Sequence, residues 1–232
     1  MPDPETPLTS IRARISTACA TVGRDPATVT LLAVSKTRRA DQIARLADRG
    51  QRHFGENYVQ EAMSKIPALA DRKLIWHFIG PLQSNKTREV AAHFNWVHSV
   101  DRAKVARRLN AQRPDHLPPL NVCLQVNVDD EDTKSGVPLS AVSELAAGFA
   151  DWPRLRLRGL MAIPRVDAED DNRAAFRRLA MTLSHLRNTM PALDTLSMGM
   201  SADYAVAIEE GATLVRIGTA LFGPRPSKEG KR

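Results

Sequence analysis

Two hydrophobic patterns alternate along almost the whole chain. Short apolar runs rich in β-branched residues are separated by longer segments in which apolar positions recur every three to four residues. The short runs predict eight strands, at residues 30–35, 52–55, 74–79, 96–99, 121–128, 157–162, 195–198 and 213–217. The longer segments predict helices at residues 8–22, 40–49, 58–68, 86–93, 102–112, 139–150, 172–188 and 202–210. Eight strands that are each followed by a helix or a helical turn indicate a single (β/α)8 barrel, a TIM barrel, with an extra N-terminal helix.

Local sequence signals agree with these boundaries. Asp101 is placed to cap the helix that follows it, and Gly50 and Gly211 fall where helices end and a left-handed residue is favoured. A doubly wound open sheet is the alternative fold, but it usually has fewer strands and often a glycine-rich first turn, which this chain lacks. We therefore predict one domain over residues 1–224 and a flexible basic tail over residues 225–232.

Composition limits the classes of protein that fit. The chain has 232 residues, of which 43% are hydrophobic, so it can build a sizeable core. It has no apolar stretch of the ~18 residues that a membrane span needs. It also has no secretory signal pattern and only two cysteines. The formal charge of +7 is spread over predicted helix faces without interleaved aromatic residues. These features indicate a cytoplasmic protein with no membrane association and no specific nucleic-acid partner.

Lys36 is the strongest candidate for chemistry in the chain. It follows the apolar run of the first predicted strand, and if Leu32 and Val34 face one side of that strand, alternation places Lys36 on the same side. Active sites in this fold lie at the carboxyl ends of the strands. Apolar surroundings lower the pKa of an ammonium group, and the resulting amine can form an imine with an aldehyde. The alternative is a lysine that ends a strand and extends into solvent, and the strand pattern alone favours that alternative.

The last two predicted strands carry the features of a phosphate site. Ser201 follows the seventh strand as a plausible helix N-cap, where its hydroxyl and the neighbouring amides suit an anion. The eighth strand ends in Gly218, which lets backbone approach a ligand closely, and the hydroxyl of Thr219 follows. Loops after strands seven and eight are the usual phosphate site of this fold. Ser201 could equally serve only as a helix cap, and Gly218 could serve only to form a turn. Arg216 favours a ligand site, because an arginine on a central strand needs a partner if it is buried.

Other chemistries fit the sequence poorly. The six histidines show neither a His-Glu-x-x-His motif nor paired spacing, so we expect no metal site. His77, on the third predicted strand, is interpreted as a barrel histidine with satisfied hydrogen bonds rather than as a general base. The Gly-x-x-x-x-Gly-Lys loop of nucleotide-binding proteins does not occur.

A set of motifs runs in order through nearly the whole chain. The motifs are Leu32-Ala33-Val34-Ser35-Lys36-Thr37, Phe54-Gly55-Glu56-Asn57-Tyr58, Trp76-His77-Phe78-Ile79-Gly80-Pro81-Leu82-Gln83, His98-Ser99-Val100-Asp101, Val126-Asn127 with Lys134-Ser135-Gly136, Arg158-Gly159-Leu160-Met161, Leu196-Ser197-Met198-Gly199-Met200-Ser201 with Asp203, and Val215-Arg216-Ile217-Gly218. Together they resemble the pyridoxal phosphate homeostasis protein family. Because the motifs recur in order along the chain, the resemblance is more specific than any one of them.

The resemblance implies a fold and a cofactor. It implies a fold-type III barrel that binds pyridoxal 5'-phosphate (PLP), similar to the barrel domain of alanine racemase but standing alone. Lys36 would be the imine partner of the cofactor aldehyde. Arg216 would lie beside the cofactor and reach either the pyridine nitrogen or the phosphate. An arginine at the pyridine nitrogen would keep that nitrogen unprotonated and weaken the ring as an electron sink.

The resemblance also assigns the remaining residues around the cofactor. Ser201, Gly218 and Thr219 would hold the phosphate, in agreement with the phosphate site that the strand ends indicate. Asn57 and Met198 would form part of the pocket wall. Seven residues are therefore expected to bind PLP when Lys36 and Arg216 are included.

Three functions fit such a site. The favoured one is a PLP-binding protein of intracellular PLP homeostasis, a monomer that carries the cofactor as a reversible Schiff base on Lys36 and supplies PLP-dependent apoenzymes without catalytic turnover. The second is an amino-acid racemase or related α-proton chemistry, and the third is an adaptor with the cofactor as a sensor. Racemases of this fold type have an extra β-rich domain and a tyrosine as second base, whereas Tyr58 and Tyr204 belong to other motifs here. Stereoinversion needs two groups on opposite faces of the substrate, and only Lys36 can be placed.

Overall fold

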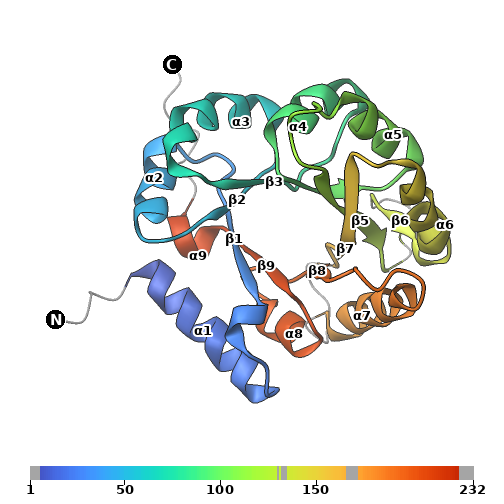
Figure 1. The fold of residues 1–232 in the computed structure, drawn as a ribbon. Helices are drawn as coiled ribbons and strands as arrows, with labels where there is room; N and C mark the ends of the chain where they lie inside the picture. The colour runs from blue at the N-terminus through green and yellow to red at the C-terminus, as the bar shows by residue number, and fades with distance from the viewer. Residues whose placement is uncertain (1–5, 130, 132–134, 166–171, 225–232) are drawn as a thin grey trace.

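The eight predicted strands form a closed parallel barrel in the computed structural model, which describes residues 6–129, 131, 135–165 and 172–224 (Figure 1). Each strand pairs in parallel with its neighbours, and pairing of the fourth strand with the fifth closes the ring. The barrel strands are β1 (Thr30–Val34), β2 (His53–Glu56), β3 (Ile75–Phe78), β4 (Trp96–Val100), β5 (Leu120–Asn127), β7 (Leu155–Met161), β8 (Thr195–Ser197) and β9 (Leu214–Ile217). The short strand β6 (Val137–Pro138), which was not predicted, pairs with β5.

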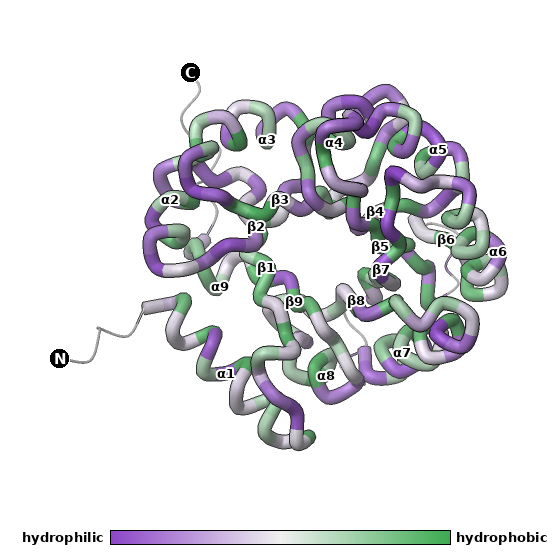
Figure 2. The backbone as a smooth tube through the Cα atoms, in the orientation of Figure 1, coloured by the Kyte–Doolittle hydropathy of each residue, from purple (hydrophilic) through white to green (hydrophobic). Residues whose placement is uncertain are grey.

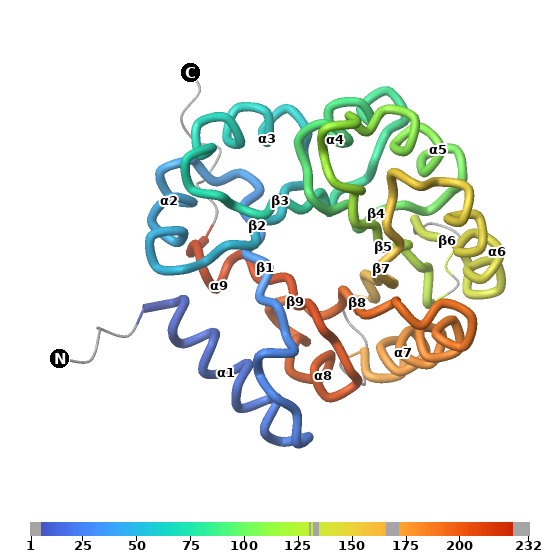
Figure 3. The backbone as a smooth tube through the Cα atoms, viewed as in Figure 1, coloured from blue at the N-terminus to red at the C-terminus, as the bar shows by residue number. Residues whose placement is uncertain are grey.

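Helices surround the barrel and carry both hydrophobic and hydrophilic residues (Figure 2), as expected when one face of each helix packs on the sheet. They are α1 (Pro7–Thr21), α2 (Ala40–Asp48), α3 (Val59–Lys65), α4 (Thr87–His93), α5 (Ala103–Gln112), α6 (Val142–Ala147), α7 (Arg173–Arg187), α8 (Tyr204–Glu209) and α9 (Thr219–Phe222). The predicted helix 58–68 ends earlier, and a 3-10 helix, Pro67–Arg72, follows, because proline cannot donate a backbone hydrogen bond within a helix. Helix α9 was not predicted, and α1 packs beside α8 and α9 (Figure 3).

The predicted helix ends are correct at two glycines and wrong at one cap. Gly50 and Gly211 adopt φ values of 85° and 100° directly after α2 and α8, which is the left-handed conformation that glycine favours. Asp101 does not cap α5. The N-cap is Arg102, which makes no side-chain capping bond, and Asp101 instead accepts a hydrogen bond from Arg102 Nη1 at 2.6 Å. The extended Arg102 therefore delays the start of the helix by one residue.

The main core lies between the barrel and the helices, and a second layer of side chains fills the interior of the barrel. Outward-facing strand residues such as Ala33, Phe54 and Val215 belong to the main core together with apolar residues of the helices. Residues 225–232, predicted as a flexible tail, lie outside the described residues. Within the described part of the chain, no helix combines the length and the apolar character that crossing a bilayer requires.

Candidate functional site

Lys36 lies in the turn that follows β1, at the carboxyl end of the barrel. The side chains of Leu32 and Val34 pack with Ile79 and Leu214 in a small cluster apart from the main core. Alternation along the strand gives Lys36, two residues beyond Val34, the same interior side, and Lys36 is half-buried. This is the end of the barrel at which the fold carries its reacting groups.

The turn that contains Lys36 is held from both sides. The Ser35 amide donates to the Gly55 carbonyl oxygen at 2.9 Å, and the Arg38 amide donates back to the Ser35 carbonyl oxygen at 3.0 Å. Thr37 adopts a φ of 64°, a conformation that strains a β-branched residue, and its amide donates to Glu61 Oε2 at 2.8 Å. Strained backbone of this kind concentrates at functional sites.

A buried ion pair supports the Lys36 turn from the helix side of the sheet. Lys65 Nζ lies 2.9 Å from Glu56 Oε1 and donates to the Ser35 carbonyl oxygen at 3.0 Å. Ser35 Oγ donates to Glu56 Oε1 at 2.6 Å, and Glu61 Oε2 lies 3.2 Å from Lys65 Nζ. Burial raises the pKa of Glu56, an effect that Lys65 and Ser35 oppose. Lys65 was not predicted; the available signal was its place on the buried face of α3, in line with Val59 and Ala62.

Arg216 lies on β9 inside the barrel and is 4% exposed. It donates from Nη1 to the Ser197 carbonyl oxygen at 2.6 Å and to Ser197 Oγ at 2.9 Å, and from Nη2 to the Ala162 carbonyl oxygen at 2.8 Å. Burial lowers the pKa of Arg216 to about 10, so the group stays charged at neutral pH. Three of the five N–H groups of a guanidinium are thus engaged, and the other two make no hydrogen bond to a described residue.

The loop after β8 is organised by Asp203 rather than by Ser201. Asp203 is the N-cap of α8, its Oδ1 accepts from the Met200 amide at 2.6 Å and its Oδ2 accepts from Asn172 Nδ2 at 2.9 Å. The prediction of Ser201 as N-cap is therefore wrong, because a turn of three residues precedes the helix. Ser201 lies exposed in that turn, where its hydroxyl can reach a ligand.

The loop after β9 approaches the Lys36 turn. A Cβ atom on Gly218 would lie 3.4 Å from the Val34 carbonyl oxygen, so Gly218 sits against the last residue of β1. Thr219 begins α9 and is exposed. The Arg38 guanidinium, which was not predicted to matter, donates to the Pro224 carbonyl oxygen at 3.0 Å and fastens the end of this segment to the β1–α2 loop.

Asn57 and Met198 lie in different surroundings. Asn57 follows β2 and is half-buried, and its Oδ1 atom is buried without a hydrogen-bond partner among the described residues. Such an atom is costly unless a ligand or solvent satisfies it. Met198 is fully buried and belongs to the main core, because its neighbour Ser197 takes the interior side. The Met198 side chain thus packs toward the helices, whereas Asn57 is available as pocket wall.

The features at the carboxyl end suit one kind of ligand. Four kinds of group lie at or near the carboxyl ends of β1, β2, β8 and β9. They are the Lys36 amine, the buried Arg216 guanidinium, the hydroxyls of Ser201 and Thr219 near Gly218, and the Asn57 amide oxygen, which has no partner among the described residues. An amine attacks an aldehyde, a guanidinium donates to a ring nitrogen or an anion, and hydroxyls donate to phosphate. The residues present therefore fit a phosphorylated aldehyde such as PLP.

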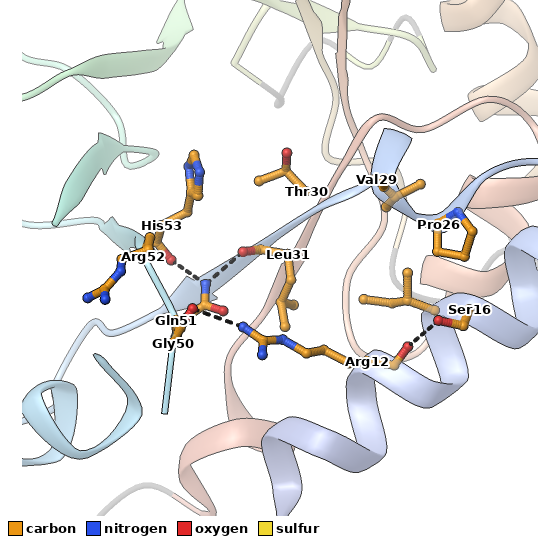
Figure 4. Close-up of a pocket in the computed structure, with 12 residues that line it drawn as sticks. Arg12, Ser16, Pro26, Val29, Thr30, Leu31, Gly50, Gln51, Arg52 and His53 are labelled. Atoms are coloured by element: carbon orange, nitrogen blue, oxygen red, sulfur yellow. Dashed lines mark hydrogen bonds between the residues drawn. The ribbon is translucent and has the colours of Figure 1, made fainter. Parts of the chain in front are cut away.

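A separate cavity lies away from the Lys36 turn. A cavity of about 480 Å3 lies between α1 and the amino ends of β1 and β2, and its Arg12 and Gln51 donors are already engaged with backbone carbonyl oxygens (Figure 4). It opens at the opposite end of the strands from Lys36. In the described segments, no group of three or more His, Cys, Asp or Glu side chains is arranged to hold a metal ion.

Comparison with known sequences gives one consistent family. A family model described as alanine racemase, N-terminal domain, matches residues 7–226. The pyridoxal phosphate homeostasis protein of Escherichia coli (strain K12) is 54% identical over 222 residues, which cover 94% of this chain and 95% of that protein. The protein of the same name from Pseudomonas aeruginosa is 58% identical over 219 residues, 94% of each chain.

Comparison with solved structures confirms the barrel. PipY of Synechococcus elongatus, in a structure with PLP bound, is 36% identical with a TM-score of 0.78, over 90% of this chain and all of that one (100%). Its structure without PLP gives 37% identity and a TM-score of 0.82, over 92% and 100%. Alanine racemase from Corynebacterium glutamicum is 18% identical with a TM-score of 0.65, over 97% of this chain and 63% of that one, and shows a shared fold.

Proposed function

We propose a function for this chain from the premise that it belongs to the pyridoxal phosphate homeostasis protein family. It binds PLP at the carboxyl end of its barrel, as a monomer in the cytoplasm, and helps to maintain the supply of the cofactor to PLP-dependent apoenzymes. Two findings support PLP as the ligand: the neighbour PipY has been solved with PLP bound, and curated relatives of 54% and 58% identity carry the homeostasis name.

In this proposal Lys36 holds the cofactor covalently. The Nζ atom attacks the aldehyde carbon and water leaves, so a Schiff base forms; addition of water reverses the step and releases the cofactor. The single observation that carries the proposal is the position of Lys36, half-buried at the carboxyl end of β1 and on the interior side that Leu32 and Val34 define. The buried Glu56–Lys65 pair keeps the turn in place.

The other predicted residues hold the remaining parts of the cofactor. Ser201, Gly218 and Thr219 bind the phosphate with hydroxyl and amide donors, and Asn57 Oδ1, orphaned among the described residues, faces the ring. Arg216 donates to the pyridine nitrogen rather than to the phosphate. The support for this choice is its anchoring inside the barrel to Ser197 and Ala162, below the loops that carry the phosphate ligands.

A racemase is the second candidate, and one observation bears on it. Stereoinversion needs a second base opposite Lys36. Tyr204 packs in the main core and is not placed for that role, and Tyr58, 56% exposed at the start of α3, shows no contact with Lys36 among the described interactions. Incubation with L-alanine in deuterated water separates the two candidates. A carrier leaves the α-hydrogen of alanine in place, whereas sustained deuterium uptake at many turnovers per protein would establish the enzyme.

The covalent site is tested by absorption and mass mapping. Purified protein with PLP is expected to show a visible band that sodium borohydride removes, with the reduced cofactor on the peptide that contains Lys36. Lys36→Ala abolishes both signals, and Lys104→Ala, which changes an exposed lysine of α5, serves as the matched control. Reduced cofactor on another lysine, or none at all in the unchanged protein, would refute the assignment.

A further inference from the structure

A chain of hydrogen-bonded side chains crosses the interior of the barrel and ends at Arg216. His53 Nδ1 lies 2.9 Å from His77 Nε2, and His77 Nδ1 lies 2.9 Å from His98 Nε2. His98 Nδ1 lies 2.8 Å from Ser197 Oγ, which accepts from Arg216 Nη1 at 2.9 Å. The three histidines are called the histidine chain below. His77, His98 and Ser197 have no exposed surface. None of the three is among the site residues predicted from the sequence.

Strand register explains why the histidines meet. In the parallel pairing, His77 of β3 lies beside Gly55 of β2 and beside Trp96 of β4. His53 stands two residues before Gly55 and His98 two residues after Trp96, so all three face the interior. The histidine chain therefore climbs from the amino end of the barrel toward its carboxyl end.

Burial keeps these imidazoles neutral. Desolvation lowers the pKa of His98 to about 3, lowers the pKa of His77 well below its ordinary value and lowers the pKa of His53. A neutral imidazole has one N–H donor and one acceptor nitrogen. Each of the three histidines therefore accepts a hydrogen bond at one ring nitrogen and donates from the other, so all the hydrogen bonds of the chain point in the same direction.

The guanidinium fixes that direction. Arg216 only donates, so Ser197 Oγ is its acceptor, and the buried hydroxyl hydrogen of Ser197 needs an acceptor of its own. His98 Nδ1, at 2.8 Å, supplies it. His98 then donates from Nε2 to His77 Nδ1, and His77 donates from Nε2 to His53 Nδ1. All three histidines carry their hydrogen on Nε2, and the opposite direction would leave the Ser197 hydrogen without this acceptor.

The far end of the histidine chain is open to a cavity. His53 lines a space of about 300 Å3 at the amino-terminal mouth of the barrel, together with Thr30, Arg158 and Asp194. Arg158 and Asp194 form an ion pair there. In Figure 4 the His53 ring points away from Arg12 and Ser16 of α1. The last N–H of the chain is thus at the only half-buried histidine of the three.

We propose that Ser197 and His98 are positioning residues for Arg216, and that His77 and His53 maintain the direction of their hydrogen bonds. The inference rests on the proposed function, in which Arg216 donates to the pyridine nitrogen. The side-chain acceptor that holds the guanidinium is neutral, so Ser197 fixes the position of Arg216 without adding a negative charge beside it. The buried Asp203 carboxylate acts on Arg216 electrostatically and raises its pKa, but no hydrogen bond joins the two among the described residues, and the charge of Arg216 acts on the ring nitrogen. A carboxylate at the position of Ser197 would hold Arg216 equally well but would cancel that charge.

The tautomers are tested first, on the protein without cofactor. Two-bond 1H–15N correlation spectra of protein labelled with 15N-histidine identify which ring nitrogen carries the hydrogen, and His→Gln variants assign the signals. The expected result at pH 7.5 is a hydrogen on Nε2 in all three residues of the histidine chain. A hydrogen on Nδ1 of His98 would overturn the inference, whatever the protein does with PLP.

The positioning role is tested by PLP binding. Ser197→Ala removes one acceptor of Arg216 and is expected to weaken binding roughly tenfold, whereas Ser197→Thr keeps the hydroxyl and restores it. His53→Leu removes the acceptor at the remote end and is expected to weaken binding about threefold, whereas His53→Gln, with an amide oxygen as acceptor, does not. His116→Gln, in an exposed loop, is the control.

The outcomes separate the two proposals. If the unchanged protein does not bind PLP, the proposed function fails while the tautomer result stands. If it binds PLP and both Ser197→Ala and His53→Leu bind as tightly as the unchanged protein, the positioning inference fails while the proposed function stands. Should Ser197→Ala fail to fold, the matched pair at His53, which lies four hydrogen bonds from Arg216, decides the question.

Discussion

The Lys36 turn and Arg216 are supported from opposite sides of the sheet and by opposite kinds of chemistry. Under the Lys36 turn, on the helix side, Glu56 and Lys65 form an ion pair with a 2.9 Å contact and almost no exposed surface. Under Arg216, inside the barrel, the support is a serine hydroxyl followed by the histidine chain. One cluster pairs charges of both signs in direct contact, whereas in the other the hydrogen-bond acceptors of the positive charge are neutral and the Asp203 carboxylate acts on it without a hydrogen bond among the described residues.

The difference follows from what each cluster must leave free. The Glu56–Lys65 pair contacts the Lys36 turn through the backbone and the hydroxyl of Ser35, and its two charges satisfy one another on the helix side of the sheet. Arg216 is itself a ligand-facing group in the proposed function, and an adjacent carboxylate would reduce its effect on the ring nitrogen. Neutral hydrogen-bond acceptors meet the donors of a buried guanidinium while its charge remains. The same barrel thus supports the Lys36 turn with a buried ion pair and Arg216 with neutral hydrogen-bond acceptors.

The largest expected effect comes from breaking the charged cluster. Glu56→Gln removes the buried carboxylate partner of the Lys65 ammonium and leaves only the more exposed Glu61 near it, and removal of one partner of a buried ion pair costs about 3–5 kcal/mol. We expect the free energy of unfolding in urea to fall by that amount at pH 7. Glu61→Gln, which changes the more exposed neighbour of Lys65, should cost far less.

The double variant sharpens this result. Lys65→Met in the Glu56→Gln background removes the orphaned charge, so stability should recover by at least 1 kcal/mol relative to Glu56→Gln, since apolar replacements of buried pairs are often neutral or stabilising by about 1–4 kcal/mol. Equal stability of the single and double variants would show that the ion pair is not the support of the turn.

Sequence patterns predicted the barrel well because each strand is short, apolar and bounded by helix signals. The eight barrel strands start or end within two residues of their predicted limits, and the arginine on β9 is buried with partners, as its position required. The register between strands could not be predicted from the sequence. The hydrophobic pattern does not show that His77 pairs with Gly55 and Trp96, and this pairing is what brings His53 and His98 close to His77. The Glu56–Lys65 contact likewise depends on how α3 packs on β2.

Solution pH is expected to affect the two clusters with opposite signs. The folded-state pKa values of the histidine chain lie below the ~6.5 of an exposed histidine, so its contribution to stability is complete above that pH and is lost as the pH falls, for His98 down to about 3. His77 and His98 should each contribute a slope of about 1.4 kcal/mol per pH unit. The raised pKa of Glu56 acts oppositely: its contribution is lost as the pH rises through the folded value.

Urea titrations between pH 5 and 8 measure this dependence. In His98→Gln the loss of stability between pH 6 and pH 5 should shrink by about 1.4 kcal/mol, because one buried imidazole no longer resists protonation. In His116→Gln the slope should match the unchanged protein. An unaltered slope in His98→Gln would mean that His98 takes up a proton in the folded state as readily as in the unfolded chain, which contradicts a neutral histidine chain.

The smallest expected effect lies in the backbone of the Lys36 turn. Thr37 has a φ of 64°, and this conformation costs a residue with a side chain about 1–2 kcal/mol. Glycine removes that strain, but it loses more conformational entropy on folding, which offsets part of the gain. Thr37→Gly should therefore raise the free energy of unfolding by about 0.5–1 kcal/mol. Thr37→Ala keeps the Cβ atom and should change it less. A loss of stability in Thr37→Gly would show that contacts of the threonine side chain help to hold the Lys36 turn. The Glu56–Lys65 ion pair would then not be its only support.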